Sequence, residues 1–530
     1  MAETAPTAAG LAETLEQYLA EHPEAAVLEE GRVAFDMRSA RYTVTGDRGR
    51  CMIQLWNEER NLIRTVVGVE TRRDCLRVLT RRMGQTRPQA LELVPSNERR
   101  TPTAREATRR QYQRLLERVL SRRFLGFKAD GFRSAMDLEH SFGPAYVRGR
   151  LLKGTTAEAV VGVSEAEPGP AIDGILTLGL LWLDYCRQHG DARRHYGTLK
   201  LVVPEGCWRT TAERLCWMNH SAARFELYTL DERSEELAQV DFRDIGNLDA
   251  RLVHAYSTES ALERCGQGLG ELWALVPAAA RSRVELRPHS ATEVALALHG
   301  LEFARVRVAA SAHSFAHHTE VSFGAGASET LLEEANRELA ERLIARLFAS
   351  RHPDGSHSDP LCRMQPEGWL ESQFRRGLAE LMPGVRGDLF YSQVPAIRTG
   401  ERSMLDLLTL DRAGRLVVIE LKANEDLQLP MQALDYWIRV RALNATREPA
   451  PGSAQPLGAF ERHGYFAGAA VSELAPRLLL AAPALRIHPA NEAVLRYFAP
   501  EIEWELIALG EAWRRELKIV HRKRWNDPRS

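Results

Sequence analysis

The chain has few cysteines, and none are spaced as metal-binding pairs. Its 530 residues include seven cysteines, an odd number, and no two are arranged as Cys-x-x-Cys. This pattern argues against a zinc ribbon and is typical of free thiols in a reducing compartment. No apolar run reaches the length of a membrane span, and the N-terminus lacks a basic stretch followed by an apolar one. We therefore expect a cytoplasmic protein that does not enter a membrane.

Two further motifs are missing. The sequence contains no phosphate-cradling Gly-x-x-x-x-Gly-Lys loop, so we expect no ATPase in this chain, and ATP-driven movement along a nucleic acid would need a partner helicase. His313, His317 and His318 have two members one helical turn apart, but they lack the Glu of the zinc-protease pattern. Because a strand is predicted over 319–323, we interpret these histidines as polar loop residues.

The net charge of −1 hides an uneven distribution along the chain. Between Gly31 and Lys128 there are about 23 Lys and Arg residues against about 10 Asp and Glu residues. Cationic surface of this kind supplies most of the affinity for phosphate backbones. We therefore expect a nucleic-acid partner, with DNA favoured over RNA.

The basic region reads as strands over 26–95, followed by a helix over 99–123. Trp56, Arg60 and Arg64 cluster where two of the strands join, and an aromatic ring beside arginines can stack on bases or clamp phosphates. The alternative is that Trp56 is a core corner with solvated arginines around it. The arginines of the helix wrap around more than one face, which fits a solvated connecting helix as well as a nucleic-acid contact.

The most informative stretch is a strand predicted over 415–423. Four apolar residues, Leu416-Val-Val-Ile419, run into Glu420 and Lys422, and this pattern is typical of a strand buried on both faces. Side chains alternate along a strand, so this carboxylate and this amine point to the same side. Buried charges are costly unless they are paired or bound to a metal ion, so these two indicate a functional site.

Neighbouring segments supply candidate partners for these charges. Asp406 is the one charge within a strand predicted over 403–411, which a turn at Asp411-Arg-Ala-Gly414 joins to the strand of Glu420. Glu371 lies at the edge of the apolar stripe of a helix predicted over 367–381. Gln432 and Tyr436 are one turn apart on a helix predicted over 429–443, with Arg439 a further turn along.

In this order, Glu371, Asp406, Glu420-x-Lys422 and Gln432-x-x-x-Tyr436 resemble the PD-(D/E)XK nuclease superfamily, in its branch with a Gln-x-x-x-Tyr motif, as in RecB-type nuclease domains. The resemblance extends to the order of elements, because a strand over 389–397 precedes the two above, and a strand over 477–485 and a helix over 491–499 follow. That order is the αβββαβ core of the restriction-endonuclease-like fold. It covers residues 355–510, about a third of the chain.

The resemblance implies an Mg²⁺- or Mn²⁺-dependent endonuclease or exonuclease. The implied metal ligands are Asp406, Glu420, the Leu421 carbonyl and Glu371, all hard oxygen donors. Lys422 would position or deprotonate the attacking water or stabilise charge on the phosphorane. Gln432 and Tyr436 would hold the substrate backbone or orient Lys422, and Arg439 would contact the nucleic acid. A homodimer is a further expectation, because many family members pair to cut both strands.

A different class of function stays open at this point. The nuclease-like fold can serve a non-catalytic nucleic-acid-binding or scaffold protein that recruits partners. Binding of Mg²⁺ or Mn²⁺ separates the two, because an intact acidic pair binds the ion and a relic does not.

We thus predict an α/β multidomain protein with a restriction-endonuclease-like C-terminal core, a β-rich basic N-terminal domain and a mixed α/β middle. Helices are also predicted over 131–141 and 291–303. The second domain has an element order similar to that of the last but no Glu-x-Lys strand, which indicates a degenerate nuclease-like domain. The four predicted domains are 1–125, 126–250, 251–354 and 355–530.

Overall fold

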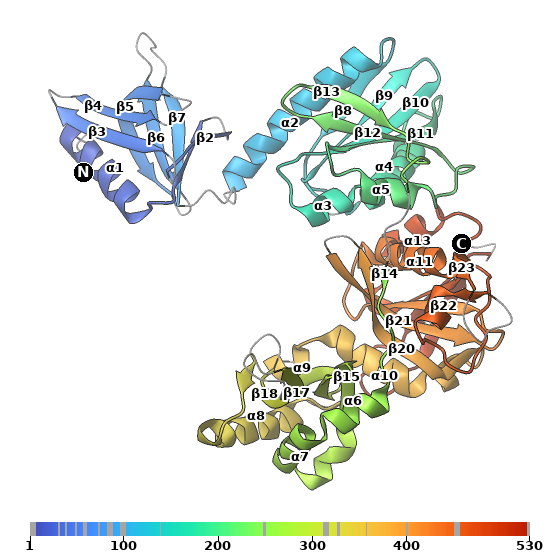
Figure 1. Ribbon diagram of the computed structural model, residues 1–530. Helices are drawn as coiled ribbons and strands as arrows, with labels where there is room; N and C mark the ends of the chain where they lie inside the picture. The colour runs from blue at the N-terminus through green and yellow to red at the C-terminus, as the bar shows by residue number, and fades with distance from the viewer. Residues whose placement is uncertain are drawn as a thin grey trace. The chain divides into compact units, whose positions relative to one another are not determined.

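The structure is a computed structural model of a mixed α/β protein with several sheets (Figure 1). None of the described helices is long and apolar enough to cross a membrane. The chain forms two compact units, Met1–Trp208 with Glu226–Val240 and Arg209–Phe225 with Asp241–Ser530. The structure describes residues 7–29, 32–37, 40–47, 50–56, 61–72, 75–81, 88–95, 102–137, 139–246, 251–310, 317–325, 329–356, 358–398, 401–449 and 456–526.

A seven-stranded antiparallel sheet opens the first unit, in the order β2-β1-β7-β6-β5-β4-β3. Leucines at helical spacing on one face of α1 pack against alternate strand residues such as Ile53 and Val78. The strands confirm the predicted strand-rich segment over 26–95. The elements are α1 (Ala8–Glu21), β1 (Ala26–Glu29), β2 (Arg32–Asp36), β3 (Arg41–Asp47), β4 (Arg50–Trp56), β5 (Asn61–Thr71), β6 (Leu76–Arg81) and β7 (Gln89–Val94).

A six-stranded sheet follows in the order β13-β12-β11-β10-β9-β8. Strands β8, β9 and β10 are antiparallel, β11 runs parallel to β10, and β12 and β13 form a hairpin. The long helix α2 packs Leu116 and Leu120 against Val160 and Val202 of the sheet. The elements are α2 (Pro102–Arg123), β8 (Lys128–Arg133), β9 (Tyr146–Lys153), β10 (Thr156–Val163), α3 (Gly169–Asp173), α4 (Ile175–His189), β11 (His195–Pro204), β12 (Arg224–Asp231) and β13 (Glu236–Val240).

The second unit contains a five-stranded antiparallel sheet in the order β15-β16-β17-β18-β19. Strand β16 is buried on both faces over Val294–Leu298, and the helices of this segment contribute core residues such as Leu272 and Ile344. The elements are α6 (Thr258–Arg264), α7 (Gly266–Leu275), η1 (Ala278–Arg283), β15 (Val284–Ser290), β16 (Glu293–Leu298), β17 (Leu301–Ala310), β18 (His317–Phe323), β19 (Thr330–Leu331), η2 (Glu334–Asn336), α8 (Arg337–Ser350) and α9 (Pro360–Arg363).

Two predicted helices are wrong. Residues 131–141 form the end of β8 and turns, because Gly131 has a φ of +65° where the strand bulges against β9. Residues 291–303 form β16 and the start of β17, joined at His299 and Gly300, whose φ values of 47° and 75° suit a tight hairpin. The segment Val294–Leu298 is buried on both faces, so its apolar run carried no period-two signal.

The last sheet has seven strands in the order β14-β20-β21-β22-β25-β26-β27. Strands β20, β21 and β22 are antiparallel, β22, β25 and β26 are parallel, and β27 returns antiparallel, so the predicted element order over 367–499 is present. The elements are β14 (Arg251–Leu252), α10 (Pro366–Leu381), β20 (Val385–Arg398), β21 (Glu401–Asp411), β22 (Leu416–Leu421), α11 (Leu429–Ala445), β23 (Arg447–Glu448), β24 (Leu457–Gly458), α12 (Ala459–Arg462), β25 (Arg477–Pro483), η3 (Ala484–Arg486), α13 (Pro489–Leu495), β26 (Trp504–Leu509) and β27 (Ile519–Arg524), with α5 (Arg209–Leu215) also in this unit.

A fully buried arginine, Arg351, joins the five-stranded sheet to the start of α10. It follows α8 in the chain, and its guanidinium lies 4.7 Å from the centre of the Trp369 ring of α10. Nearby, the backbones of Gly300 and Gly368 are so close that a Cβ on Gly300 would lie 1.9 Å from the Gly368 oxygen. The guanidinium donates to the carbonyls of Leu298, His299, Leu361 and Met364 at 2.7 to 2.9 Å.

We predict that Arg351→Met lowers the free energy of unfolding of the second unit by at least about 3 kcal/mol, because several buried carbonyls lose their donor. Thermal unfolding followed by circular dichroism measures the change. The matched control is Arg342→Met, on an exposed position of α8. Equal melting temperatures for the two variants would contradict this role for Arg351.

Candidate functional site

Glu420 and Lys422 lie together where the central strand β22 ends. Glu420 is 1 % exposed, and its carboxylate is 3.2 Å from the Lys422 amine. The backbone N–H of Lys422 donates to the Ala481 carbonyl of β25, which fixes the chain just beyond the strand. The two charges therefore share one face, and the partly exposed amine lies between the buried acid and solvent.

The pairing of β21 with β22 places the backbone of Asp406 opposite that of Glu420. Its turn is closed by Asp411, whose side chain accepts from two backbone N–H groups. Leu407 pairs with Ile419, so the preceding Asp406 and the following Glu420 have their backbones at the same level of the hairpin. The side chain of Asp406 lies outside the described residues, and its predicted ligand role stays a prediction.

Successive side chains of β22 point to opposite faces of the sheet, and each face packs against a different helix. Ile419 and Leu421 pack against α10, in a cluster with Leu370 and Phe374. Glu420 and Lys422 must then face the other side of the sheet, where α11 packs against β22 and β25. Helix α11 also carries the Gln-x-x-x-Tyr pair, so both motifs belong to the same side of the sheet.

The candidate residues of α11 are all half-buried. Gln432 lies in the first turn, and its side-chain oxygen is buried and accepts no hydrogen bond from the described residues. Tyr436 and Arg439 follow at one-turn intervals, as predicted. The helix begins at Leu429 with Pro430 in its first turn, a position where the missing N–H of proline costs nothing.

Glu371 reaches the end of β22 from the α10 side. It is 7 % exposed, and its carboxylate is 3.7 Å from the guanidinium of Arg287 on β15. Glu371 and Glu420 therefore approach the strand from opposite faces of the sheet. Glu371 lines a cavity of about 380 Å³ whose other walls include Arg287, His289, Glu302, Arg305 and Leu421.

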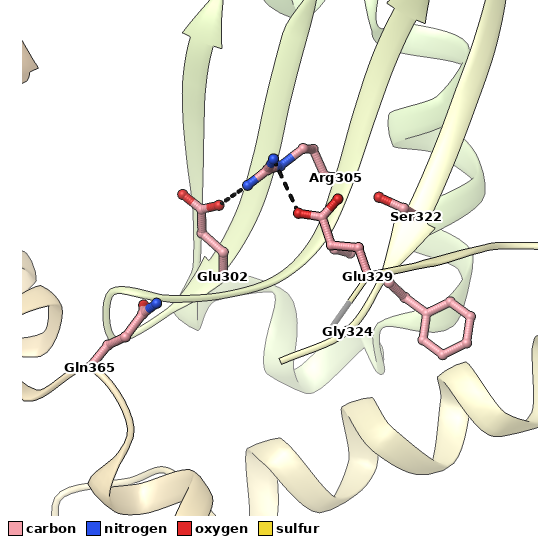
Figure 2. A pocket seen from close by; sticks show the side chains of 8 residues that line it. Glu302, Arg305, Ser322, Gly324, Glu329 and Gln365 are labelled. Atoms are coloured by element: carbon pink, nitrogen blue, oxygen red, sulfur yellow. Dashed lines mark hydrogen bonds and ion pairs between the residues drawn. The ribbon is translucent and has the colours of Figure 1, made fainter. Parts of the chain in front are cut away.

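Ion pairs fix the charged walls of this cavity on the five-stranded sheet. Figure 2 shows a neighbouring pocket that shares Glu302, Arg305 and Gln365 with this cavity, and there Arg305 lies between Glu302 and Glu329. Arg305 is 2.8 Å from Glu302 and 3.1 Å from Glu329. Burial alone would raise the pKa of Glu302, but hydrogen bonds from His289 and Arg305 and their charges hold it at about 2. This carboxylate therefore stays ionised at neutral pH and orients both of its partners.

A second group of ion pairs ties β15 to α10. Glu285 accepts from Ser372 and from Arg376, the latter at 2.5 Å, and lies 3.2 Å from Arg287. Burial raises the pKa of Glu285, yet the Ser372 hydrogen bond and the two guanidinium charges outweigh it and lower the pKa below its usual value. The strand that carries Arg287 is thus held rigidly beside Glu371.

Sequence reasoning missed this cavity wall. Arg287, His289, Glu302 and Arg305 come from strands more than sixty residues before Glu371, and no local motif links them to it. Glu302 also fell in the segment wrongly predicted as a helix. Only the tertiary contact between β15 and α10 brings these residues to the candidate site.

Among the predicted nucleic-acid residues of the first unit, Arg64 has a structural partner. The side chain of Arg64 is 11 % exposed and pairs with Glu29 at 2.9 Å, while Trp56 is half-buried at the end of β4. The ion pair restrains Arg64, so it is not one of the solvated arginines of the core alternative, and the nucleic-acid contacts of Trp56 and Arg64 stay predictions. Arg60 lies outside the described residues.

The histidine group offers no metal centre among the described residues. His313 and the side chain of His317 lie outside them, and His318 is exposed and 2.9 Å from Glu320. More broadly, the described part of the chain contains no group of three or more His, Cys, Asp or Glu side chains that could hold an ion. The side chain of Asp406 lies outside the described residues, and the predicted Mg²⁺ or Mn²⁺ ligand set stays a prediction.

Comparison with known proteins adds no assignment. The chain matches no protein-family model, and no curated protein matches it.

We predict that His299 makes the second unit less stable as the pH falls from 6.5 towards 4. This ring stacks on Trp369, and burial, followed by the charges of Arg376 and Arg351, lowers its pKa from 6.5 to about 4. The unfolded chain then takes up a proton first, so stability is complete above pH 6.5 and falls by up to about 3 kcal/mol towards pH 4.

Urea unfolding at pH 7.5 and at pH 4.8 measures this loss. His299→Asn should reduce the difference, because asparagine tolerates the left-handed backbone there and does not titrate. The control is His521→Asn, at an exposed position on β27. The assignment fails if the His299 variant has the same pH dependence as wild type.

Proposed function

We propose that the protein is a metal-dependent nuclease of the restriction-endonuclease-like class, which hydrolyses phosphodiester bonds, in DNA rather than RNA, for repair, recombination or defence against foreign DNA. The single observation that carries this proposal is the pair of Glu420 and Lys422. Burying a carboxylate beside an amine 3.2 Å away at the end of a central strand costs desolvation free energy that the pairing offsets only in part, and a role in chemistry accounts for retaining such a pair.

The donor chemistry fits a hard divalent cation. Glu420, the Leu421 carbonyl and Asp406 of the adjoining strand offer oxygen atoms, which Mg²⁺ and Mn²⁺ prefer. Such an ion would polarise the phosphoryl oxygen and favour ionisation of a bound water. In this proposal Glu420 and Asp406 hold the ion, and Glu371 supplements them.

Lys422 has the role of placing a positive charge beside the reacting phosphate. Glu420 holds its amine by charge, and the partial exposure of the side chain leaves it accessible to a substrate. Gln432 and Tyr436 belong to the helix on the same side of the sheet and would contact the substrate backbone or the Lys422 amine. Arg439 extends that helix face with a further positive charge.

A second candidate is a non-catalytic nucleic-acid-binding or scaffold protein that keeps the fold. Two observations favour it: Glu371 is ion-paired with Arg287, and it approaches β22 from the face opposite to Glu420. A relic of this kind would bind nucleic acid without binding the metal ion tightly. The metal measurement below therefore separates the two candidates.

We predict that Glu420→Gln and Lys422→Met each reduce cleavage of plasmid DNA in Mg²⁺ or Mn²⁺ by at least about a hundredfold, because each removes a charge at the reacting phosphate. Rates are measured on supercoiled, single-stranded and branched substrates. The matched control is Glu503→Gln, a carboxylate of the same sheet region that pairs with Arg415 and should keep full activity. Variants as active as wild type would refute the assignment of these residues.

We further predict that Mn²⁺ at a hundred times its Kd raises the stability of the wild-type protein by about 2.7 kcal/mol, because the ion binds only the folded site. Thermal unfolding with and without Mn²⁺ measures the shift. The same experiment on Glu420→Gln should show a much smaller shift. An identical response of both proteins, or none in wild type, would favour the scaffold candidate.

A further inference from the structure

The six-stranded sheet of the first unit repeats the element order of the C-terminal sheet. The first runs α2, β8, β9, β10, α4, β11, α5, β12, β13, and the second runs α10, β20, β21, β22, α11, β25, α13, β26, β27, apart from short insertions. The strands also take the same spatial order in both sheets, β8 to β13 and β20 to β27. In each, three antiparallel strands lead to a parallel one through a helix, and the last two form a hairpin.

Strand registers align the two copies residue by residue. Strands β11 and β25 both end in proline, Pro204 and Pro483. Three residues before these prolines, Leu201 pairs with Val161 and Leu480 pairs with Glu420. Val161 is therefore the counterpart of Glu420, and two residues on, Val163 is the counterpart of Lys422.

The directions in which the side chains of the two strands point support this alignment. Val160 packs against α2, and its counterpart Ile419 packs against α10. Val161 and Glu420 then both face away from those helices.

The antiparallel neighbours align in the same way. Val161 pairs with Arg148 on β9, and Asp406 on β21 is at the level of Glu420. Arg148 is 2 % exposed, lies 4.6 Å from the centre of the Phe142 ring and donates to the Ala135 carbonyl. A buried guanidinium thus occupies the position at which the other copy has a carboxylate.

The first helices complete the comparison. Helix α2 buries Tyr112, Leu116 and Leu120, and α10 buries Leu370, Phe374 and Leu378 at the same spacing. This alignment makes Gln113 the counterpart of Glu371. Gln113 donates to the Phe132 carbonyl and to Glu117, so it links α2 to β8.

We infer that the chain carries an internally duplicated fold with one metal centre, in the C-terminal copy, and a first copy that is a non-catalytic counterpart. The inference rests on the proposed function for the existence of that centre. At the four aligned positions the first copy has Gln113, Arg148, Val161 and Val163, which offer no carboxylate, and the guanidinium would repel a cation. All four residues are described by the structure.

Reciprocal hydrogen bonds within the second unit join equivalent segments of the two copies. The segment after α5 pairs with the segment after α13, because Asn219 donates to the Tyr497 carbonyl and Ala499 donates to the Trp217 carbonyl, at 2.7 and 2.9 Å. Met218 and Phe498 form the antiparallel bridge between them.

One centre per chain predicts that a chain acting alone nicks duplex DNA. Each turnover adds one water to one phosphorus and breaks one P–O bond, and the leaving oxygen takes a proton, so only one strand opens. Cutting the second strand requires a second encounter. Supercoiled plasmid should thus convert to open circles first, and linear product should appear later, at a rate that rises with enzyme concentration.

The test combines this time course with the number of Mn²⁺ ions bound by the full chain, counted by electron paramagnetic resonance. We expect one centre per chain in wild type, none in Glu420→Gln, and one, with unchanged nicking, in Gln113→Ala. If the centre contains two ions, both should be lost together in Glu420→Gln.

Mn²⁺ binding or DNA cleavage that persists in Glu420→Gln would overturn the single centre. It would leave the proposed metal-dependent nuclease in place. Linear product that forms without open circles from a chain that is monomeric by analytical ultracentrifugation would do the same. A wild-type chain that binds no Mn²⁺ and cuts no DNA would instead overturn the proposed function, and the centre with it.

Discussion

The arrangement of the second unit depends on the buried guanidinium of Arg351. A charge taken out of water is tolerated only when its donors are satisfied, and here they meet carbonyls from the β16–β17 hairpin and from the segment before α10. Burial lowers the pKa of this group to about 10, which still leaves it charged at neutral pH. The close approach of Gly300 to Gly368 completes the contact, so the five-stranded sheet and α10 hold a fixed geometry.

That fixed geometry explains how the candidate site acquires residues from two sheets. With β15 held beside α10, Arg287 lies next to Glu371, and the cavity between the sheets is lined by ion pairs of set orientation. The Arg287 charge restrains Glu371, while Lys422 balances Glu420 from the other face of the last sheet. The two acids are thus stabilised by different partners, and a ligand at the end of β22 would have to draw them together.

Sequence patterns predicted the parts of the fold that local residues determine. The apolar run before Glu420, the Asp411–Gly414 turn and the stripe of α10 each specify an element on their own, and all three are present. The 291–303 segment could not be assigned in this way, because a strand buried on both faces has the same apolar composition as a buried helix. The cavity wall was beyond prediction for a different reason, since contacts between distant segments create it.

The duplication shows why a strand pattern alone does not identify a site. Both copies place a central strand in the same register, and both bury a charge at that level, but one has Glu420 beside Lys422 and the other has Arg148 against aromatic rings. The rings of Phe142 and Trp182 and the Ala135 carbonyl contact the arginine in the first copy. Glu420 is a buried acid beside a partly exposed amine, and its carboxylate oxygens are of the kind that a hard cation prefers. The chemical difference between the copies therefore lies in the sign of the buried charge and in the groups that compensate it.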